Sequence, residues 1–198
     1  MMKVVLASSN AGKIQELQTM LNDLDVTIIP QTKLQVIDAE ETGLTFVENA
    51  LIKARHACEQ TGLPALADDS GLTVAALQGA PGIYSARYAG ANASSEDNIT
   101  KLLQVMQHIP LSERHAAYYC VLVFMTHAKD PTPIICTGSW QGEILSAPQG
   151  KMGFGYDPVF YVPKENKTAA ELPLHVKNQL SHRGQALHKL LKKLTNKI

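Results

Sequence analysis

The sequence has few cysteines, no excess of charge of either sign and no long apolar run. Its three cysteines, Cys58, Cys120 and Cys136, are widely spaced, and no cysteine pair or cysteine–histidine cluster has the spacing of a zinc site. Cys120 and Cys136 lie in apolar, strand-like stretches, which is typical of small core residues. We therefore expect no zinc site and a location in the reducing cytoplasm.

The charges balance, with 18 Lys and Arg residues against 18 Asp and Glu residues. Proteins that bind long nucleic acids usually carry a basic excess, often as a basic patch interleaved with aromatic residues. This sequence has neither feature, so direct binding of nucleic acid is disfavoured. A small anionic ligand is compatible with the composition, because local charge can be arranged without a net excess.

The longest apolar stretches fall short of the ~20 residues that cross a membrane. The apolar start at residues 3–7 is followed by Ser8, Ser9 and Asn10, which is typical of a strand and turn rather than a signal peptide. We expect no membrane association. A chain of 198 residues that is 45% hydrophobic can bury a real core, and we expect a single domain over residues 1–198.

Strand-like and helix-like segments alternate early in the chain, which predicts an α/β fold. Apolar stretches predict strands at residues 3–7, 26–30, 64–68, 116–126 and 133–141, with 72–75 extending or returning the third. Helical spacing of apolar residues predicts helices at 12–24, from Thr45 to about 61, 96–107 and 185–194. Thr45 and Glu48 match a capping box. The segments 79–90 and 150–158 are predicted loops, and a turn at 128–131 predicts an antiparallel pair of long strands.

Residues 8–13, Ser-Ser-Asn-Ala-Gly-Lys, connect the first predicted strand to the first helix. A helix N-terminus presents free N–H groups and a positive dipole end, so anions bind there. Gly12 permits close backbone approach, Asn10 offers amide donors and Lys13 supplies charge. The GxxxxGK[ST] pattern of a P-loop is absent. Taken alone, the segment is more typical of an ordinary turn in which Ser9 or Asn10 caps the helix.

Acidic residues occur at two places. Asp68 and Asp69 end a strand with a buried pattern, where a carboxylate is costly unless it is paired or metal-bound. Neighbouring strand residues point to opposite faces, so we expect the two to serve different partners. Glu40 or Glu41 together with Asp69 would suit magnesium, which takes one or two carboxylates with phosphate oxygens and water. Alternatively, Asp69 and Ser70 brace a turn and the glutamates are solvated.

Two later segments carry further candidate ligands. Residues 153–158, Gly-Phe-Gly-Tyr-Asp-Pro, free an aromatic ring to lie against a flat ligand, although aromatics that fill the core of a glycine-rich hairpin are commoner. Ser181 can cap the last helix, and His182 and Arg183 in its first turn would oppose the helix dipole. Such a broken local rule is mild support for a site, where Arg183 would donate to a base carbonyl and Lys177 would pair with phosphate. Solvated surface residues are the alternative.

Together these motifs resemble the inosine triphosphate pyrophosphatase family, also called the deaminated-purine nucleoside triphosphate pyrophosphatases. The resemblance covers nearly the whole chain, with the motifs in the same order. The sequence is similar to the bacterial branch of the family. The resemblance rests on segments 8–13, 40–43, 45–50, 53–54, 67–72, 79–88, 153–158 and 181–184.

The resemblance implies an α/β fold with an elongated mixed sheet flanked by helices, forming two lobes around a deep cleft, and a homodimer. It implies Mg²⁺-dependent hydrolysis of dITP, ITP, XTP and dXTP to the monophosphate and pyrophosphate. This activity would remove deaminated purines from the nucleotide pool before they enter DNA or RNA. Hypoxanthine and xanthine have a 6-oxo group in place of the adenine amino group, so donors at that edge would reject adenine.

The resemblance also implies residue roles. The triphosphate would be held by Ser8, Ser9, Asn10, Ala11, Gly12, Lys13 and Lys53. Glu40 and Asp69 would bind magnesium, with Glu41 as an alternative or supporting acid, and Asp69 would be the general base. The rest of the substrate would contact Ser70, Phe154, Gly155, Tyr156, Asp157, Lys177, His182 and Arg183. Phe154 would stack on the base, and His182 and Arg183 would lie near it.

Two other functions could use the same loops. A module that senses a purine nucleotide without cleaving it would not need Asp69. A pyrophosphatase acting on modified pyrimidines is a second alternative. Phe154 and the His182–Arg183 pair argue against the pyrimidine substrate, through the resemblance alone.

Overall fold

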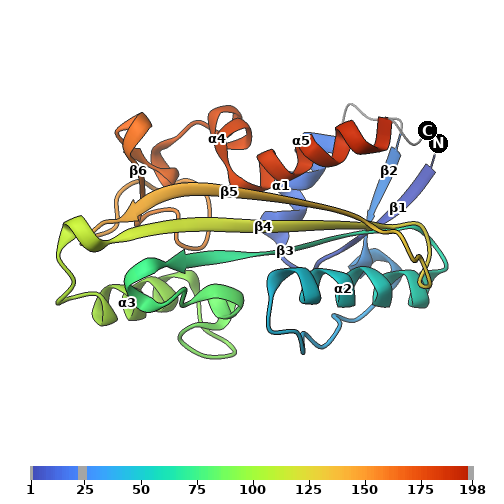
Figure 1. The fold of residues 1–198 in the computed structure, drawn as a ribbon, viewed down its shortest axis with the longest axis horizontal. Helices are drawn as coiled ribbons and strands as arrows, with labels where there is room; N and C mark the ends of the chain where they lie inside the picture. The colour runs from blue at the N-terminus through green and yellow to red at the C-terminus, as the bar shows by residue number, and fades with distance from the viewer. Residues whose placement is uncertain (1, 22–25, 196–198) are drawn as a thin grey trace. The chain divides into compact units, whose positions relative to one another are not determined.

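The computed structural model describes residues 2–21 and 26–195. Within these ranges seven strands form one sheet in the order β2-β1-β3-β4-β5-β6-β7 (Figure 1). The strands are β1 (Met2–Ala7), β2 (Val26–Pro30), β3 (Ala65–Val74), β4 (His115–Met125), β5 (Ile134–Ile144), β6 (Phe160–Val162) and β7 (Lys167–Thr168). The α-helices are α1 (Ala11–Leu21), α2 (Phe46–Thr61), α3 (Ser95–Val105), α4 (Leu174–Leu180) and α5 (His182–Thr195).

The sheet is mixed. β1 pairs in parallel with β2, Val4 opposite Ile28, and with β3, Leu6 opposite Leu66. β6 pairs antiparallel with both β5 and β7. β4 and β5 are neighbours joined by residues 126–133, a connection too short for the crossover that parallel strands require. The predicted α/β fold with a mixed sheet flanked by helices is therefore confirmed.

The described residues group into two compact units. The first contains residues up to Asp69, Cys120–Gly138 and residues from Arg183 onward, and the second contains Ser70–Tyr119 and Ser139–His182. Strands β3, β4 and β5 supply residues to both units. The single domain over residues 1–198 and the cleft between two lobes stay predictions.

The first unit has a core on each face of its strands. On one face α1 and α5 pack against alternate strand residues, including Leu66 and Leu122. On the other face α2 packs against their sequence neighbours, including Ala67 and Val121 (Figure 1). This alternation follows from the two-residue period of a strand. Continued along β3, it sends Asp68 toward α1 and α5 and Asp69 toward α2.

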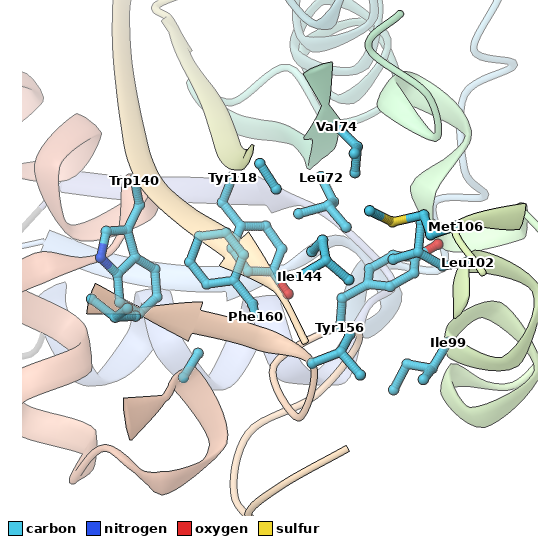
Figure 2. Close-up of a cluster of buried hydrophobic side chains, with 14 of the residues drawn as sticks. Leu72, Val74, Ile99, Leu102, Met106, Tyr118, Trp140, Ile144, Tyr156 and Phe160 are labelled. Carbon is cyan, nitrogen blue, oxygen red and sulfur yellow. The ribbon is translucent and has the colours of Figure 1, made fainter. Parts of the chain in front are cut away.

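The second unit has an aromatic core. Figure 2 shows Tyr118, Phe160 and Trp140 together, with Tyr156 and the side chains of α3 beyond them. The ring centroids of Tyr118 and Phe160 lie 4.6 Å apart, and those of Trp140 and Phe160 lie 5.2 Å apart. Tilted ring pairs at these spacings are favourable beyond the area that they bury. The β4 segment that carries Tyr118 is thus held rigidly.

Several element boundaries differ from the predictions. β3 is one continuous strand from Ala65 to Val74, so residues 72–74 extend the third strand instead of returning it. The predicted loop at 79–90 contains a 3₁₀ helix, Gly82–Arg87. α5 begins at His182 instead of Gln185. α1 is described over Ala11–Leu21, and the predicted helix residue Leu24 lies outside the described residues. The short elements β6, β7 and α4 were not predicted, because they are too brief to show a clear period.

Buried cysteines match the prediction for the core, since Cys120 is fully buried and Cys136 is 4% exposed. No helix in the described part of the chain is both long and apolar enough to cross a membrane.

Candidate active site

The predicted site residues divide between the two units. The first unit carries Ser8, Ser9, Asn10, Ala11, Gly12, Lys13, Glu40, Lys53, Asp69 and Arg183. The second unit carries Ser70, Phe154, Gly155, Tyr156, Asp157, Lys177 and His182.

The loop from Ser8 to Asn10 joins β1 to α1. Asn10 caps the helix, because its Oδ1 accepts a hydrogen bond from the backbone N–H of Lys13 at 3.1 Å. The N–H of Asn10 itself donates to Ser8 Oγ at 3.2 Å, and Ser9 Oγ donates to Asp38 Oδ2 at 2.5 Å. Ser9, Asn10 and Ala11 are exposed. The Asn10 cap follows the ordinary-turn alternative, and binding of an anion at the positive end of α1 stays a prediction.

Asp68 is a fully buried carboxylate beneath this loop. Its Oδ1 lies 2.6 Å from Lys13 Nζ, and its Oδ2 accepts from Arg183 Nε at 2.9 Å. The thiol of Cys120 also donates to Oδ2, at 3.3 Å. Burial by itself would raise the pKa of Asp68, but the charges of Arg183 and Lys13 outweigh it and hold the pKa well below its ordinary value. Asp68 thus stays ionised and fixes the Lys13 ammonium.

Arg183 lies inside the first unit, 2% exposed. Besides Asp68 it pairs with Glu16, a buried acid of α1. Burial opposes the charge of Arg183, yet the carboxylates of Asp68 and Glu16 raise its pKa. A guanidinium between two carboxylates ties the start of α5 to α1 and β3. The predicted contact of Arg183 with a base stays a prediction.

Asp69 points to the opposite face of β3, toward α2. Its Oδ1 lies 2.7 Å from Lys53 Nζ, and the same ammonium lies 3.1 Å from Glu41 Oε1. Asp68 and Asp69 therefore have different first partners, as the alternation predicted. Burial raises the pKa of Asp69 against the lowering charges of Lys53 and Lys13, and Glu41 adds to the rise. The charges of Asp69 and Glu41 in turn outweigh burial and raise the pKa of Lys53.

The second carboxylate oxygen of Asp69 lacks a hydrogen bond among the described residues. Oδ2 is buried and has no hydrogen-bond partner among the described residues. Buried carboxylate oxygens are nearly always satisfied, so such an atom calls for an explanation such as a bound ion or water. Magnesium needs only one or two carboxylates from the protein. Within residues 2–21 and 26–195 there is no group of three or more His, Cys, Asp or Glu residues that could hold a metal ion.

The acidic loop before α2 is fastened to that helix. Thr45 Oγ1 accepts from the N–H of Glu48 at 3.3 Å, as predicted for the cap. Glu48 Oε2 reaches back to the N–H of Leu44 at 2.9 Å, and the N–H of Gly43 donates to Asn49 Oδ1 at 2.8 Å. These bonds hold the segment that carries Glu41.

Glu40 and Glu41 differ in setting. Glu40 is exposed, whereas Glu41 is half-buried and shares Lys53 with Asp69. The structure thus brings Glu41, the supporting acid of the sequence prediction, to Asp69 through a common lysine. Glu40 as a metal ligand stays a prediction.

In the second unit Asp157 organises the glycine-rich segment. Its Oδ2 accepts from Lys177 Nζ at 2.6 Å and from the N–H of Phe154 at 2.9 Å. Gly153 has a positive φ of 82°, and a Cβ there would lie 2.1 Å from Asp157 Oδ2. Lys177 is 5% exposed and its ammonium lies 5.0 Å from the centre of the Phe154 ring. Lys177 thus faces Asp157 and Phe154.

The two aromatics of this segment have different surroundings. Tyr156 fills the core, 4% exposed, and its hydroxyl donates to the Ser85 carbonyl at 2.9 Å. Burial raises its pKa. Phe154 is half-buried and lies between Gly153 and Gly155, both of which have a positive φ. Tyr156 therefore follows the core-filling alternative, and stacking of Phe154 on a base stays a prediction.

His182 and Ser70 complete the second group. His182 is 5% exposed and stacks on Tyr118, with ring centroids 4.7 Å apart and planes 8° apart. Ser70 is half-buried at the point where β3 enters the second unit.

Sequence reasoning missed three residues that contact candidate residues within their own units. Glu16 and Tyr118 look like ordinary residues of a helix and a strand, and only the fold shows that they contact Arg183 and His182. Asp38 lies in a stretch without a clear pattern, far in sequence from Ser9. A buried acid such as Glu16 next to apolar helix positions was the one available signal, since such an acid needs a cationic partner.

Within this α/β architecture, the chain matches the model of the Ham1 family over residues 4–193. Among curated proteins, the dITP/XTP pyrophosphatase of Pectobacterium atrosepticum is 59% identical over 196 residues, covering 99% of this chain and all of the relative. The protein of the same name from Escherichia coli is 57% identical over the same length, with the same coverage.

Solved structures of similar proteins have the same fold. A HAM1 protein from Coxiella burnetii is 56% identical and matches with a TM-score of 0.92 over 99% of this chain and all of that chain. The Staphylococcus aureus Ham1 protein is 41% identical, with a TM-score of 0.87 and the same coverage. The chain belongs to the Ham1 family, and the family assignment made from the sequence is confirmed.

Proposed function

We propose that this protein hydrolyses deaminated purine nucleoside triphosphates, dITP, ITP, XTP and dXTP, to the monophosphate and pyrophosphate. The substrate class is supported by full-length relatives named dITP/XTP pyrophosphatase. The observation that carries the chemistry is the Asp69 carboxylate, with one oxygen on Lys53 and the other buried without a partner among the described residues. Removal of such nucleotides from the pool before they enter DNA or RNA would be the role.

The residues around Asp69 fit a magnesium ion. Asp69 Oδ2 is a hard oxygen ligand without a hydrogen-bond partner among the described residues. Glu41, which shares Lys53 with Asp69, supplies a second carboxylate. Glu40 is the alternative second acid from the same loop. Magnesium bound by these acids would neutralise phosphate charge and make a nearby water easier to deprotonate.

The chain's own groups would then do the following. The end of α1 and the ammonium of Lys13 would hold phosphate oxygens, with Ser8 to Gly12 supplying further donors. Asp69 would accept the proton of the attacking water, while Lys53 keeps that carboxylate oriented. The water oxygen forms the new P–O bond as the bridge between the α and β phosphates breaks and pyrophosphate leaves. Phosphoryl transfer chiefly needs such positioning and charge neutralisation.

For the base, we assign the half-buried ring of Phe154 to stacking and His182 to one edge. Lys177, Asp157 and Tyr156 would hold the Phe154 segment in place, with Gly155 and Ser70 completing the substrate contacts. Arg183 would act at the base only by exchanging its contacts with Asp68 and Glu16. The homodimer and the cytoplasmic location belong to the same proposal and rest on the family resemblance and the cysteine pattern.

The test is to incubate the protein with dITP, XTP, dATP and dGTP and to identify the products by chromatography. We expect monophosphate and pyrophosphate in equal amounts from the first two substrates only. Release of orthophosphate instead of pyrophosphate, or equal turnover of all four, would contradict the proposal. Tight binding of dITP without turnover would favour the nucleotide-sensing alternative.

A further inference from the structure

Tyr118 lies where the aromatic core of the second unit meets its candidate site residues. It is 8% exposed, and its ring stacks on His182 with centroids 4.7 Å and planes 8° apart. On the core side the same ring contacts Phe160, at 4.6 Å between centroids (Figure 2). Its hydroxyl donates to Asp157 Oδ1 at 3.2 Å.

The bond to Asp157 extends the influence of Tyr118 to the glycine-rich segment. Tyr118 binds Oδ1 of Asp157, while Oδ2 accepts from the N–H of Phe154 and from Lys177. A carboxylate held from both oxygens has a fixed orientation, and charge-assisted bonds of this kind are the strong ones. The backbone of Phe154 is therefore positioned by a carboxylate that Tyr118 helps to orient.

The contact with His182 fixes a second group. Nearly parallel rings at this spacing set the plane of the imidazole, since rotating it would lose the stack on Tyr118. Phe160 and Trp140 support the Tyr118 ring from the core, so the surface on which His182 rests is rigid. A rigid support is what discrimination between purine edges requires, because small displacements weaken selective hydrogen bonds.

We propose that Tyr118 is a positioning residue for base selectivity. Its ring sets the plane of His182, and its hydroxyl, through Asp157, sets the Phe154 segment. The inference rests on the proposed function, in which Phe154 and His182 contact the base. Tyr118 itself would not touch the substrate.

Two substitutions separate the two contacts. Tyr118→Phe removes the hydroxyl bond and keeps the stack. We expect it to raise KM for every accepted substrate about threefold to tenfold, the range for one ordinary hydrogen bond, with kcat and the dITP-to-dGTP selectivity preserved. Tyr118→Leu also removes the stack, and we expect the ratio of kcat/KM for dITP over dGTP to fall about tenfold or more.

Phe160→Leu is the matched control. It thins the same aromatic core next to Tyr118 but leaves the hydroxyl and the ring of Tyr118 in place. We expect a loss of melting temperature similar to that of Tyr118→Leu but a smaller loss of the selectivity ratio, because Tyr118 keeps its stack on His182 and its bond to Asp157. The imidazole proton resonances of His182, recorded without ligand, should lose their ring-current shift in Tyr118→Leu and keep it in Tyr118→Phe.

The outcomes are distinguishable. Wild-type protein that releases no pyrophosphate from dITP would overturn the proposed function, and the His182 resonances would then decide whether Tyr118 positions that ring. If the wild type is active and folded Tyr118→Leu keeps its selectivity, the inference is wrong. Should Tyr118→Leu fail to fold, an unchanged KM in Tyr118→Phe would overturn the part carried by the hydroxyl. If Phe160→Leu lost as much selectivity as Tyr118→Leu, Tyr118 would act only through core packing and the inference would be wrong.

Discussion

Lys53 and Asp69 form a partly buried ion pair in which only one oxygen of the carboxylate is bound. Nζ lies 2.7 Å from Oδ1, whereas Oδ2 has no hydrogen-bond partner in the part of the chain that the structure describes. Lys53 also holds Glu41, at 3.1 Å, so one cation fixes both acids. Each acid comes from a different segment, β3 and the loop before α2, and Lys53 comes from α2 itself.

Lys53→Met should lower kcat/KM for dITP by about a hundredfold, the scale for loss of one preorganised electrostatic group. The substitution removes a cation from the phosphate region, and it also removes a charge that lowers the pKa of Asp69. Steady-state pyrophosphate release measures the effect. Lys189→Met, at an exposed lysine that donates to the Thr137 carbonyl, is the control and should keep wild-type kinetics. Near-normal activity of Lys53→Met would contradict the assignment.

Asp68→Asn should destabilise the fold at neutral pH by about 3–5 kcal/mol, because Arg183 and Lys13 would keep their charges with one buried partner removed. Urea unfolding measures this loss. Glu59→Gln, at an exposed carboxylate of α2, is the control and should change the free energy of unfolding little. An equally small effect of Asp68→Asn would show that the buried pair contributes nothing.

The pH dependence of that loss follows from the pKa of Asp68, which folding lowers from an ordinary value of 3.8. A lowered pKa stabilises the folded state fully above the ordinary value, and the contribution is lost as the pH falls toward the folded-state pKa. The gap between wild type and Asp68→Asn should therefore be constant near neutral pH and narrow below about pH 4. A gap that widened on acidification would contradict the assignment.

Gly43→Ala should impair catalysis. A Cβ at this position would lie 2.5 Å from Glu48 Cβ and 2.7 Å from Asn49 Oδ1, so the loop that carries Glu41 must move. We expect kcat/KM to fall about tenfold or more, because sub-ångström displacements of catalytic groups are costly. Thr42→Ala, at the exposed neighbouring residue, should leave the kinetics unchanged. Equal kinetics in the two variants would argue against a role for this loop.

The sequence predicted the α/β fold and the longer strands and helices, because strand and helix periods and the Thr45 cap are local signals. It also predicted that Asp68 and Asp69 serve different partners, since the alternation of a strand requires it. The tertiary contacts of the site residues could not be predicted from the sequence. Nothing local indicates that Arg183 would be buried between Asp68 and Glu16, or that Tyr118 would support His182.

The separate settings of the two glutamates were also not predictable. Glu40 and Glu41 are adjacent in sequence and identical in chemistry, and only the path of the loop decides which one faces Lys53. That path depends on bonds from Gly43 and Leu44 to α2, which the capping pattern suggested only in part.

The most direct test of the account compares wild type with Asp69→Ala, measuring both pyrophosphate release from dITP and dITP binding by calorimetry, with magnesium and with EDTA. We predict that wild-type release requires magnesium, and that Asp69→Ala nearly abolishes release while dITP still binds. Release by wild type that is equal in EDTA, or an Asp69→Ala variant that hydrolyses dITP at the wild-type rate, would contradict the central role of Asp69.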